Sequence, residues 1–356
     1  MRQSYRTRFA VVALILALCS VWMAPASSSA YTVETYDWDN VRIGGGGSIP
    51  GIVLHPQVEG LAYVRTDVGS MYRWDDAAET WTPITEWMTM FEGSGWLYGI
   101  EAIAVDPSDA TGNVVYASIG KTAYSFSPKG EVIKSTDRGQ TWTRTGHRTW
   151  TASNWDHEYG ERLAVDPNNS SIVYHASREG LFRSMDGGSN WTLTSAPTGD
   201  ISQAMSSGNT PSGSLFVVID PGTTTGTPAR SATLYVGAYN DGIYRSTDGG
   251  TTFHKLSGGP SVFYRAELGV DGTLYIAGGG LWKYDGSAWT DISPVSGAEF
   301  MGLAVDPQDA NHLIVSKQDS GSAAHNLPMW RSTNGGSSWT LMDMSKNLTT
   351  PWMPAW

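Results

Sequence analysis

The stretch Ser135-Thr136-Asp137-Arg138-Gly139-Gln140-Thr141-Trp142 decides the fold of this chain, because it returns along the sequence in recognisable copies. Near-complete copies share the pattern S-x-(D/N)-x-G-x-x-(W/F), and two degenerate copies keep an acidic turn that leads to a tryptophan. The copies lie at residues 74–81, 135–142, 184–191, 246–253, 284–289 and 332–339. Their spacing of roughly 40 to 60 residues is that of propeller blades joined by loops of variable length.

Each copy predicts a tight hairpin turn. Asp and Gly are turn-forming residues, and Gly accepts backbone angles that other residues avoid. The Asp side chain can accept hydrogen bonds from the backbone N–H groups of its own turn. The aromatic residue that closes the motif starts the next strand and packs under the turn. We therefore interpret the motif as an Asp-box, and we expect its residues to be structural and not catalytic.

Short strands surround every turn. An apolar strand that ends in Asp-Pro comes first, as in residues 103–107 and 163–167. A second strand follows, such as residues 114–118, and a third precedes the turn directly, such as residues 180–183. Short alternating strands separated by turn residues predict an all-β protein of the β-propeller class.

Six blades can be recognised, and the sixth ends near Leu341. The segment 36–41 resembles residues 80–84, which form the fourth strand of the first blade. An N-terminal strand of this kind commonly completes the last blade and removes free sheet edges. We therefore predict a seven-bladed type whose last blade is incomplete in this chain, with its other strands expected beyond Trp356.

The first 30 residues are typical of a secretory signal peptide. Arginines lie in the first eight residues, residues 9–22 are apolar, and Ser28-Ser29-Ala30 is a small-residue cleavage site. We therefore expect residues 31–356 to form the folded N-terminal propeller domain of a secreted, extracellular protein. The single cysteine, Cys19, lies within the signal segment, so we expect no disulfide in the exported protein.

The composition favours a neutral ligand. The net charge of −11 disfavours nucleic acid or an anionic membrane as a partner, and no later apolar run approaches the length of a membrane span. The seven histidines are scattered without the paired spacing of zinc sites, so no metal is expected. No nucleotide fingerprint is present, and no cofactor is expected. Many glycines and tryptophans with few charges are typical of turn-rich β proteins that bind sugars.

Propeller topology predicts which face binds the ligand. The repeated turns join third and fourth strands, so the connections between second and third strands lie on the opposite face, where propeller ligands normally bind over the central channel. The first blade places Asp67 on that face, in the tight loop of residues 64–69. An aspartate that only caps its own turn is the alternative. Further candidates on such loops are Arg178, Glu179, Asn240, Asp241, Asp319 and His325.

The long connections between blades carry aromatic residues outside the blade pattern. Sugar rings present flat C–H faces that stack on exposed aromatic rings. We therefore predict Trp96, Tyr98, Trp150 and Trp155 as substrate-binding residues. The alternative is that some of them only pack loops against the blades. Further tryptophans on such segments are Trp87, Trp352 and Trp356.

Four phrases resemble glycoside hydrolase family 74. They lie at residues 44–56, 62–75, 97–107 and 160–167, and the resemblance extends over most of residues 36–356. It implies two seven-bladed propellers that face each other across a cleft and hydrolyse the β-1,4-glucan backbone of xyloglucan with inversion. It also implies that Asp67 is the general base and that a second propeller domain carries the general acid.

Several functions remain open at this point. The chain is either the general-base half of an endo-β-1,4-glucanase, active or inactive in isolation, or a non-catalytic glucan-binding propeller or truncated pseudo-enzyme. Departures such as Ser70 and residues 153–159 put the shape of the subsites in question. A sialidase is disfavoured because the early Arg-Ile-Pro phrase is missing, and nothing supports an assembly factor.

Overall fold

The computed structural model describes residues 32–35, 43, 49–66, 69–88, 99–120, 129–151, 160–199, 213–317 and 328–343. In this part of the chain every regular element is a β-strand. No helix in the described residues has the length and apolar character needed to cross a membrane.

Six four-stranded antiparallel units follow one another in chain order. Blade 1 contains β2 (Gly51–Leu54), β3 (Ala62–Arg65), β4 (Met71–Asp75) and β5 (Thr80–Pro83). Blade 2 contains β6 (Ile100–Val105), β7 (Val115–Ile119), β8 (Gly130–Ser135) and β9 (Thr143–Thr149). Blade 3 contains β10 (Leu163–Val165), β11 (Val173–Ser177), β12 (Gly180–Ser184) and β13 (Trp191–Leu193).

The second half of the ring repeats this plan. Blade 4 contains β14 (Ser214–Ile219), β17 (Leu234–Ala238), β18 (Gly242–Ser246) and β19 (His254–Lys255). Blade 5 contains β20 (Phe263–Leu268), β21 (Leu274–Gly278), β22 (Gly280–Tyr284) and β23 (Trp289–Asp291). Blade 6 contains β24 (Phe300–Val305), β25 (Leu313–Lys317), β26 (Met329–Ser332) and β27 (Thr340–Asp343). A small hairpin, β15 (Thr224–Thr225) and β16 (Arg230–Ser231), interrupts the connection from β14 to β17.

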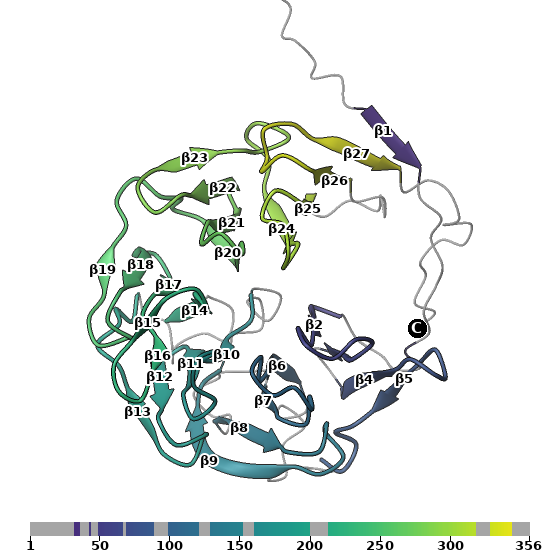
Figure 1. The fold of residues 1–356 in the computed structure, drawn as a ribbon, viewed down its shortest axis with the longest axis vertical. Coiled ribbons are helices and arrows are strands. Elements are labelled where there is room, and N and C mark those ends of the chain that lie inside the picture. Colours follow the sequence, from purple (N-terminus) through teal and green to yellow (C-terminus); the bar gives the residue numbers. More distant parts are fainter. Residues whose placement is uncertain are drawn as a thin grey trace, which may run out of the picture.

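Figure 1 shows these sheets arranged in a ring, with the first strand of each blade nearest the centre and the fourth strand at the rim. The prediction of an all-β propeller is confirmed. The described residues form six blades, however, where the sequence predicted a seven-bladed type. The N-terminal strand β1 (Thr32–Thr35) pairs in parallel with β27 and extends blade 6 to five strands. Its pairing satisfies the free outer edge of that blade. The segment 36–41, predicted as a strand, lies outside the described residues.

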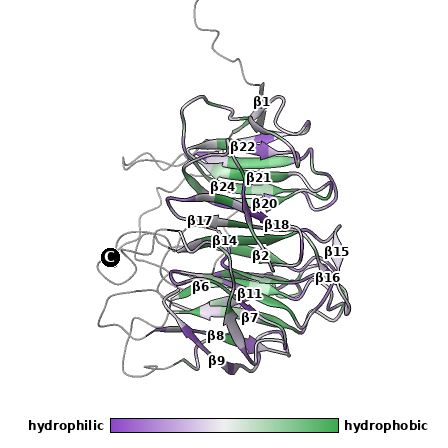
Figure 2. Cartoon of the chain, turned by 90° about the vertical axis from the view of Figure 1, so that its left-hand side faces the viewer, coloured by the Kyte–Doolittle hydropathy of each residue, from purple (hydrophilic) through white to green (hydrophobic). Residues whose placement is uncertain are grey.

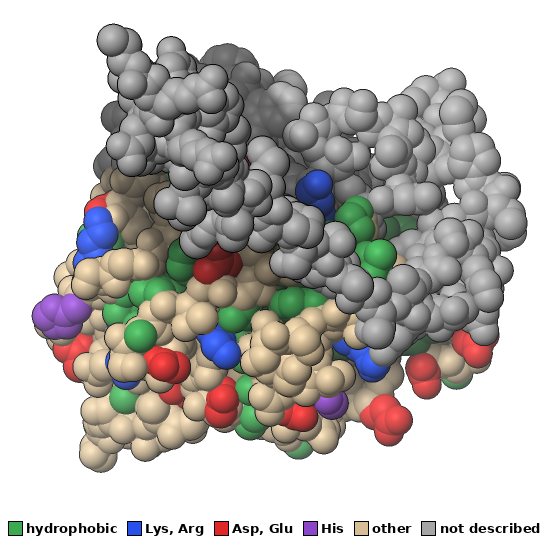
Figure 3. All heavy atoms as spheres, turned by 90° about the horizontal axis from the view of Figure 1, so that it is seen from above, with side chains coloured by type: hydrophobic (Ala, Val, Ile, Leu, Met, Phe, Trp, Pro, Cys, Tyr) green, Lys and Arg blue, Asp and Glu red, His purple; other side chains and the backbone are tan. Residues whose placement is uncertain are grey.

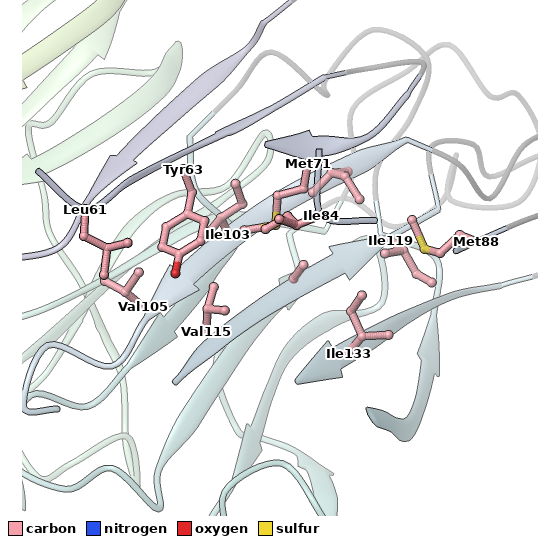
Figure 4. Close-up of a cluster of buried hydrophobic side chains, with 12 residues drawn as sticks. Leu61, Tyr63, Met71, Ile84, Met88, Ile103, Val105, Val115, Ile119 and Ile133 are labelled. Carbon is pink, nitrogen blue, oxygen red and sulfur yellow. The ribbon is translucent and has the colours of Figure 1, made fainter. Parts of the chain in front are cut away.

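Apolar side chains fill the junction between each blade and the next. One buried cluster lies at each junction from blade 1 to blade 6. Figure 4 shows the first, in which Leu61, Tyr63 and Met71 of blade 1 pack with Ile103 and other side chains of blade 2. Within the described part of the chain, no comparable packing joins blade 6 to blade 1. The flank of blade 1 on that side leaves Ile52 and Leu54 59% and 68% exposed.

The repeated turns are closed by their own side chains. In blade 2, Ser135 Oγ donates to Asp137 Oδ1 at 2.7 Å and accepts from the backbone N–H of Gly139 at 2.8 Å. Gly139 has a φ of +83°, which a residue with a Cβ rarely adopts. Trp142 Nε1 donates to the carbonyl of Ile84 in blade 1 at 2.9 Å. The turn of blade 2 therefore both closes its own blade and fastens it to blade 1.

Candidate functional site

Two faces of the ring can be assigned from the strand directions. The β15–β16 hairpin joins a first strand to a second strand, and Figure 2 shows it at one side of the disc. Because neighbouring strands are antiparallel, the repeated turns share that side. The connections from second to third strands, and from each blade to the next, lie on the opposite side. We call this opposite side the channel face.

The surface view in Figure 3 shows acidic and basic side chains interspersed among neutral ones over the described part of the molecule. No broad basic patch gathers on the described surface in that view. The charges that shape the channel face are instead held inside the ring, close to its axis. They come from the first strand of blade 5, from the segment before blade 3 and from the end of the second strand of blade 1.

The base of the loop that contains Asp67 is firmly anchored, although Asp67 itself lies outside the described residues. Thr66 is buried, and its hydroxyl donates to the carbonyl of Ser70 at 2.9 Å across the loop. The carbonyl of Thr66 accepts the N–H of Ile100 from blade 2 at 3.2 Å. The two ends of residues 67–68 are thus fixed relative to each other and to the neighbouring blade.

Arg65, which precedes this loop, is fully buried and ion-paired. Its Nε lies 3.0 Å from Glu161 Oε1, and Glu161 Oε2 accepts the N–H of Ile103 at 2.9 Å. The glycine at position 51 is required here, because a Cβ would collide with both Arg65 and Glu161. Blades 1, 2 and 3 therefore meet around one buried ion pair.

Blade 5 reaches across the ring axis to the same region. The guanidinium of Arg265 donates to the carbonyl of Pro50, and the N–H of Gly160 donates to the carbonyl of Tyr264 at 2.8 Å. Glu267, further along β20, is enclosed by protein yet partly open to the channel. Burial raises its pKa to about 7, opposed by the charge of Arg265 and assisted by that of Glu161. We call Arg65, Glu161, Arg265 and Glu267 the polar layer.

Trp150 is the one predicted substrate-binding residue that the structure describes. It is half-buried at the end of β9, and the ammonium of Lys129 lies 4.3 Å from its ring centroid. Lys129 Nζ pairs with both oxygens of Glu179, at 2.9 and 3.0 Å. Glu179 also accepts the hydroxyl of Thr149 at 2.5 Å and the N–H of Trp150 at 3.3 Å. The ring is thus held in one position at the rim of blades 2 and 3.

Burial raises the pKa of Glu179, whereas the hydrogen bonds from Thr149 and Lys129 lower it. The hydrogen bonds dominate, so the pKa of Glu179 lies below its ordinary value. The carboxylate therefore stays charged in mildly acidic solution and keeps Lys129 in place. No group of three or more His, Cys, Asp or Glu side chains in the described residues could hold a metal ion. Trp96, Tyr98 and Trp155 lie outside the described residues, so their role beside Trp150 stays a prediction.

Sequence reasoning missed the polar layer and Lys129. Arg65 and Glu161 lie in two of the phrases that resemble family 74, but nothing local to either phrase indicated that they pair, because they are 96 residues apart. Lys129 immediately precedes Gly130, where β8 begins, and this position at the channel-face end of a third strand was the available signal.

The comparisons with known proteins give one consistent result, although no family model matches the chain. A xyloglucanase of Acetivibrio thermocellus is 35% identical over 374 residues, which covers 94% of this chain and 43% of that protein. A solved GH74 enzyme of Niastella koreensis is 36% identical with a TM-score of 0.72, covering 85% of this chain and 46% of that one.

A solved GH74 xyloglucanase of Xanthomonas campestris is 29% identical with a TM-score of 0.73, covering 87% of this chain and 47% of that one. The chain thus spans less than half the length of the relatives it matches. The similarity extends over nearly the whole chain and includes both sequence and three-dimensional arrangement.

Proposed function

We propose that this chain is a propeller portion of a xyloglucanase of glycoside hydrolase family 74, and that it forms one wall of a xyloglucan-degrading cleft. In this proposal the whole protein is secreted, acts outside the cell and hydrolyses the β-1,4-glucan backbone with inversion. The observation that carries the proposal is the 35% identity to a xyloglucanase over 94% of the chain.

Asp67 is the proposed general base. Inversion requires one carboxylate that activates water and one carboxylic acid that protonates the leaving oxygen, about 6.5–9.5 Å apart. The supports on either side of Asp67 suit such a role, since Thr66 is fixed to Ser70 and Arg65 is fixed to Glu161. A rigid loop keeps a base at one distance from its water.

The general acid is proposed to lie on a second propeller, across the cleft. The first blade also leaves an apolar groove of about 460 Å³ open between Ile52, Leu54 and Trp81. At every described junction the corresponding flank is covered by a neighbouring blade. We propose that a seventh blade covers this groove in the whole protein, and that the repeated turns act as structural Asp-boxes around the ring.

Trp150, together with Trp96, Tyr98 and Trp155, is the proposed glucan platform. The support for Trp150 is its place at the end of β9, where Lys129 lies over its ring and is held there by Glu179. The second candidate function is a non-catalytic glucan-binding propeller or a truncated pseudo-enzyme. It rests on Trp150, which is held beside Lys129 and Glu179 and could stack on a sugar ring without any catalytic group.

Hydrolysis of xyloglucan tests the proposal. The assay compares this chain, a longer form that includes the rest of the protein wherever the coding sequence continues, and Asp67→Asn in that longer form. We expect activity from the longer form, α-configured first products by NMR, and a loss of at least about 1,000-fold in the variant. Asp241→Asn is the control, since Lys255 already pairs with that carboxylate.

Full activity of Asp67→Asn would remove Asp67 from the mechanism. β-configured first products would replace inversion by retention. Binding of xyloglucan by the longer form without any hydrolysis would establish the non-catalytic alternative.

A further inference from the structure

The beginning of β20 brings Tyr264 to the mouth of the central channel. Its carbonyl accepts the N–H of Gly160 from the segment that leads into blade 3. The next residue, Arg265, donates to the carbonyl of Pro50 ahead of blade 1. Tyr264 therefore lies directly beside the polar layer, where blades 1, 3 and 5 approach one another.

The hydroxyl of Tyr264 donates to Glu299 Oε2 at 3.2 Å. Glu299 belongs to the connection from blade 5 to blade 6 and is exposed, while Tyr264 is half-buried. Burial and then the charge of Glu299 raise the pKa of Tyr264 to about 12, so the hydroxyl remains a donor. Among the described residues, Glu299 Oε1 accepts no hydrogen bond, which leaves it available to a ligand hydroxyl.

The turn of blade 5 beside this pair consists of glycines and carries no side chain of its own, although the exposed Val262 of the neighbouring segment lies against it. Blade 5 joins its second and third strands through Gly278-Gly279-Gly280, and the N–H of Gly279 donates to the carbonyl of Val262 at 3.1 Å. The corresponding turns of blades 3 and 4 carry charged side chains, Glu179 and Asp241. An extended chain could therefore leave the channel mouth over blade 5 without meeting a side chain on this turn.

We propose that Tyr264 and Glu299 form a sugar-binding subsite for a neutral glucan at the channel mouth. The proposal rests on the function proposed above and adds a contact on blade 5, which lies across the ring from blade 2 (Figure 1). The ring of Tyr264 offers apolar area for the C–H face of a pyranose. The carboxylate of Glu299 accepts hydrogen bonds from neighbouring hydroxyls, and such bonds to a charged group are the stronger kind.

Blade 4 offers a matched control pair. Tyr244 donates to Asp241 Oδ2 at 2.9 Å, as Tyr264 does to Glu299. Here, however, Lys255 Nζ occupies Asp241 Oδ1 at 3.1 Å, so both carboxylate oxygens are engaged within the protein. The two pairs have the same chemistry, but only the pair at the channel mouth has an oxygen left for a ligand.

Isothermal titration of the full chain tests the subsite with two probes, cellotetraose and a xyloglucan heptasaccharide. We expect Glu299→Gln and Tyr264→Ala each to weaken binding about tenfold. Asp241→Asn and Tyr244→Ala should stay within about twofold of the unmodified chain. Gly279→Leu adds a side chain to the glycine turn of blade 5. It should weaken binding of the longer xyloglucan probe more than binding of cellotetraose. Circular dichroism and urea unfolding verify that each variant is folded.

The outcomes separate this inference from the proposed function. If Trp150→Ala weakens binding while Tyr264→Ala, Glu299→Gln and Gly279→Leu do not, the subsite is refuted and the glucan-binding function stands. If the unmodified chain binds neither probe, the subsite is refuted, and hydrolysis by the longer form then decides the proposed function separately. If Asp241→Asn and Tyr244→Ala lose as much affinity for the probes as the Glu299 and Tyr264 variants do, the subsite is also refuted. Such a result would show that the free carboxylate oxygen of Glu299 does not determine binding.

Discussion

The guanidinium of Arg65 is fully buried, so its charge needs a counter-charge inside the protein. Glu161 supplies it, and the same carboxylate holds the backbone of Ile103. One side chain from blade 3 therefore fixes a residue of blade 1 and a strand of blade 2. Because Arg65 stands just before the loop of Asp67, the position of that loop depends on Glu161.

Replacing Glu161 by Gln tests this dependence. The amide keeps an acceptor oxygen but removes the charge opposite a buried guanidinium, and breaking buried pairs typically costs about 3–5 kcal/mol. Since Glu161 is 25% exposed, we expect a smaller loss of roughly 1–3 kcal/mol in the free energy of unfolding, measured in urea. Lys255→Met, which removes an exposed pair with Asp241, should change it by less than about 1 kcal/mol. Equal effects of the two variants would contradict the argument.

Two histidines are buried together between blades 2 and 3. His147 Nε2 lies 3.2 Å from His175 Nδ1, and His175 Nε2 lies 3.0 Å from Ser118 Oγ. The ring of His147 stacks on Trp191 at 4.5 Å between centroids. Burial lowers the pKa of His147 to about 4, with Glu179 raising it and Lys129 lowering it. Burial lowers the pKa of His175 well below the ordinary value, and His147 and Arg162 lower it further.

These directions predict the pH dependence of stability. The ordinary pKa of histidine is 6.5, so between pH 6.5 and about 4 the unfolded chain binds protons that the folded chain does not. Stability is therefore complete above pH 6.5 and falls as the pH is lowered, by up to about 1.4 kcal/mol per pH unit for each histidine. Urea midpoints measured from pH 7.5 to 4.5 should show this slope.

His147→Phe should reduce that slope by about one proton, because Phe fits beside Phe182 and Trp191 and does not titrate. Exposed His254, changed to Gln, is the control and should leave the slope as it was. A slope that is unchanged in His147→Phe would show that other groups cause the acid sensitivity.

In blades 1 to 5 the second strand carries a tyrosine, and in blades 2 and 3 this tyrosine donates to the repeated turn of the next blade. Blades 1 to 5 carry Tyr63, Tyr116, Tyr174, Tyr235 and Tyr275, each opposite a lysine or arginine of the third strand. Tyr174 donates to the carbonyl of Gly249 in the turn of blade 4 at 3.2 Å, and Arg183 donates to the same carbonyl at 3.0 Å. The pair ties strands of one blade to the turn of another.

Tyr174→Phe should therefore lower the free energy of unfolding by about 0.5–1.5 kcal/mol, the net value of one buried hydrogen bond. Tyr63 is the matched control, because its buried hydroxyl has no hydrogen-bond partner among the described residues. Tyr63→Phe should be neutral or stabilising, since it removes a buried polar atom without breaking a bond. Thermal or urea unfolding measures the free energy of unfolding of both variants. An equal loss of stability in the two would show that the hydrogen bond of Tyr174 does not stabilise the protein.

The elements themselves could be predicted well from sequence, because strand pairing here is local. The predicted strands at 114–118 and 180–183 correspond to β7 and β12 within a residue. The alternation of apolar residues and the Asp-Gly turns depend only on neighbours along the chain. The pairing of β1 with β27 joins the two ends of the described chain, so no local pattern could predict it. The β15–β16 hairpin was missed because each of its strands is two residues long.

The candidate site could be predicted only in part, for the same reason. The loop of residues 64–69 and the aromatic residues between blades could be predicted because they depart from the repeat. Such departures are visible directly in the sequence. The partners that orient them come from other blades: Glu161 for Arg65, Glu179 for Trp150, Glu299 for Tyr264. Which blades face each other across the axis depends on the closure of the ring, and residue spacing does not contain that information.

At the scale of the whole molecule, five of the junctions around the ring are sealed by buried apolar clusters, and the flank of blade 1 is the exception in the described residues. There Ile52 and Leu54 are largely exposed beside Trp74 and Trp81. Adjacent exposed apolar side chains of this kind mark surfaces that are covered in the working protein. If the proposed seventh blade is that cover, the same residues must change from surface to core when it is present.

The double variant Ile52→Thr with Leu54→Gln distinguishes these two environments. In this chain alone it should change the free energy of unfolding by no more than about 0.5 kcal/mol per residue, as expected of exposed positions. In a form of the protein that supplies the seventh blade, the same changes should cost about 2–5 kcal/mol, as in a core. Leu61→Ala, at a position 6% exposed, is the control and should be costly in both forms. If the double variant leaves the free energy of unfolding of the longer form unchanged, the groove stays open there. Trp74 and Trp81 would then have to be explained as part of a binding surface.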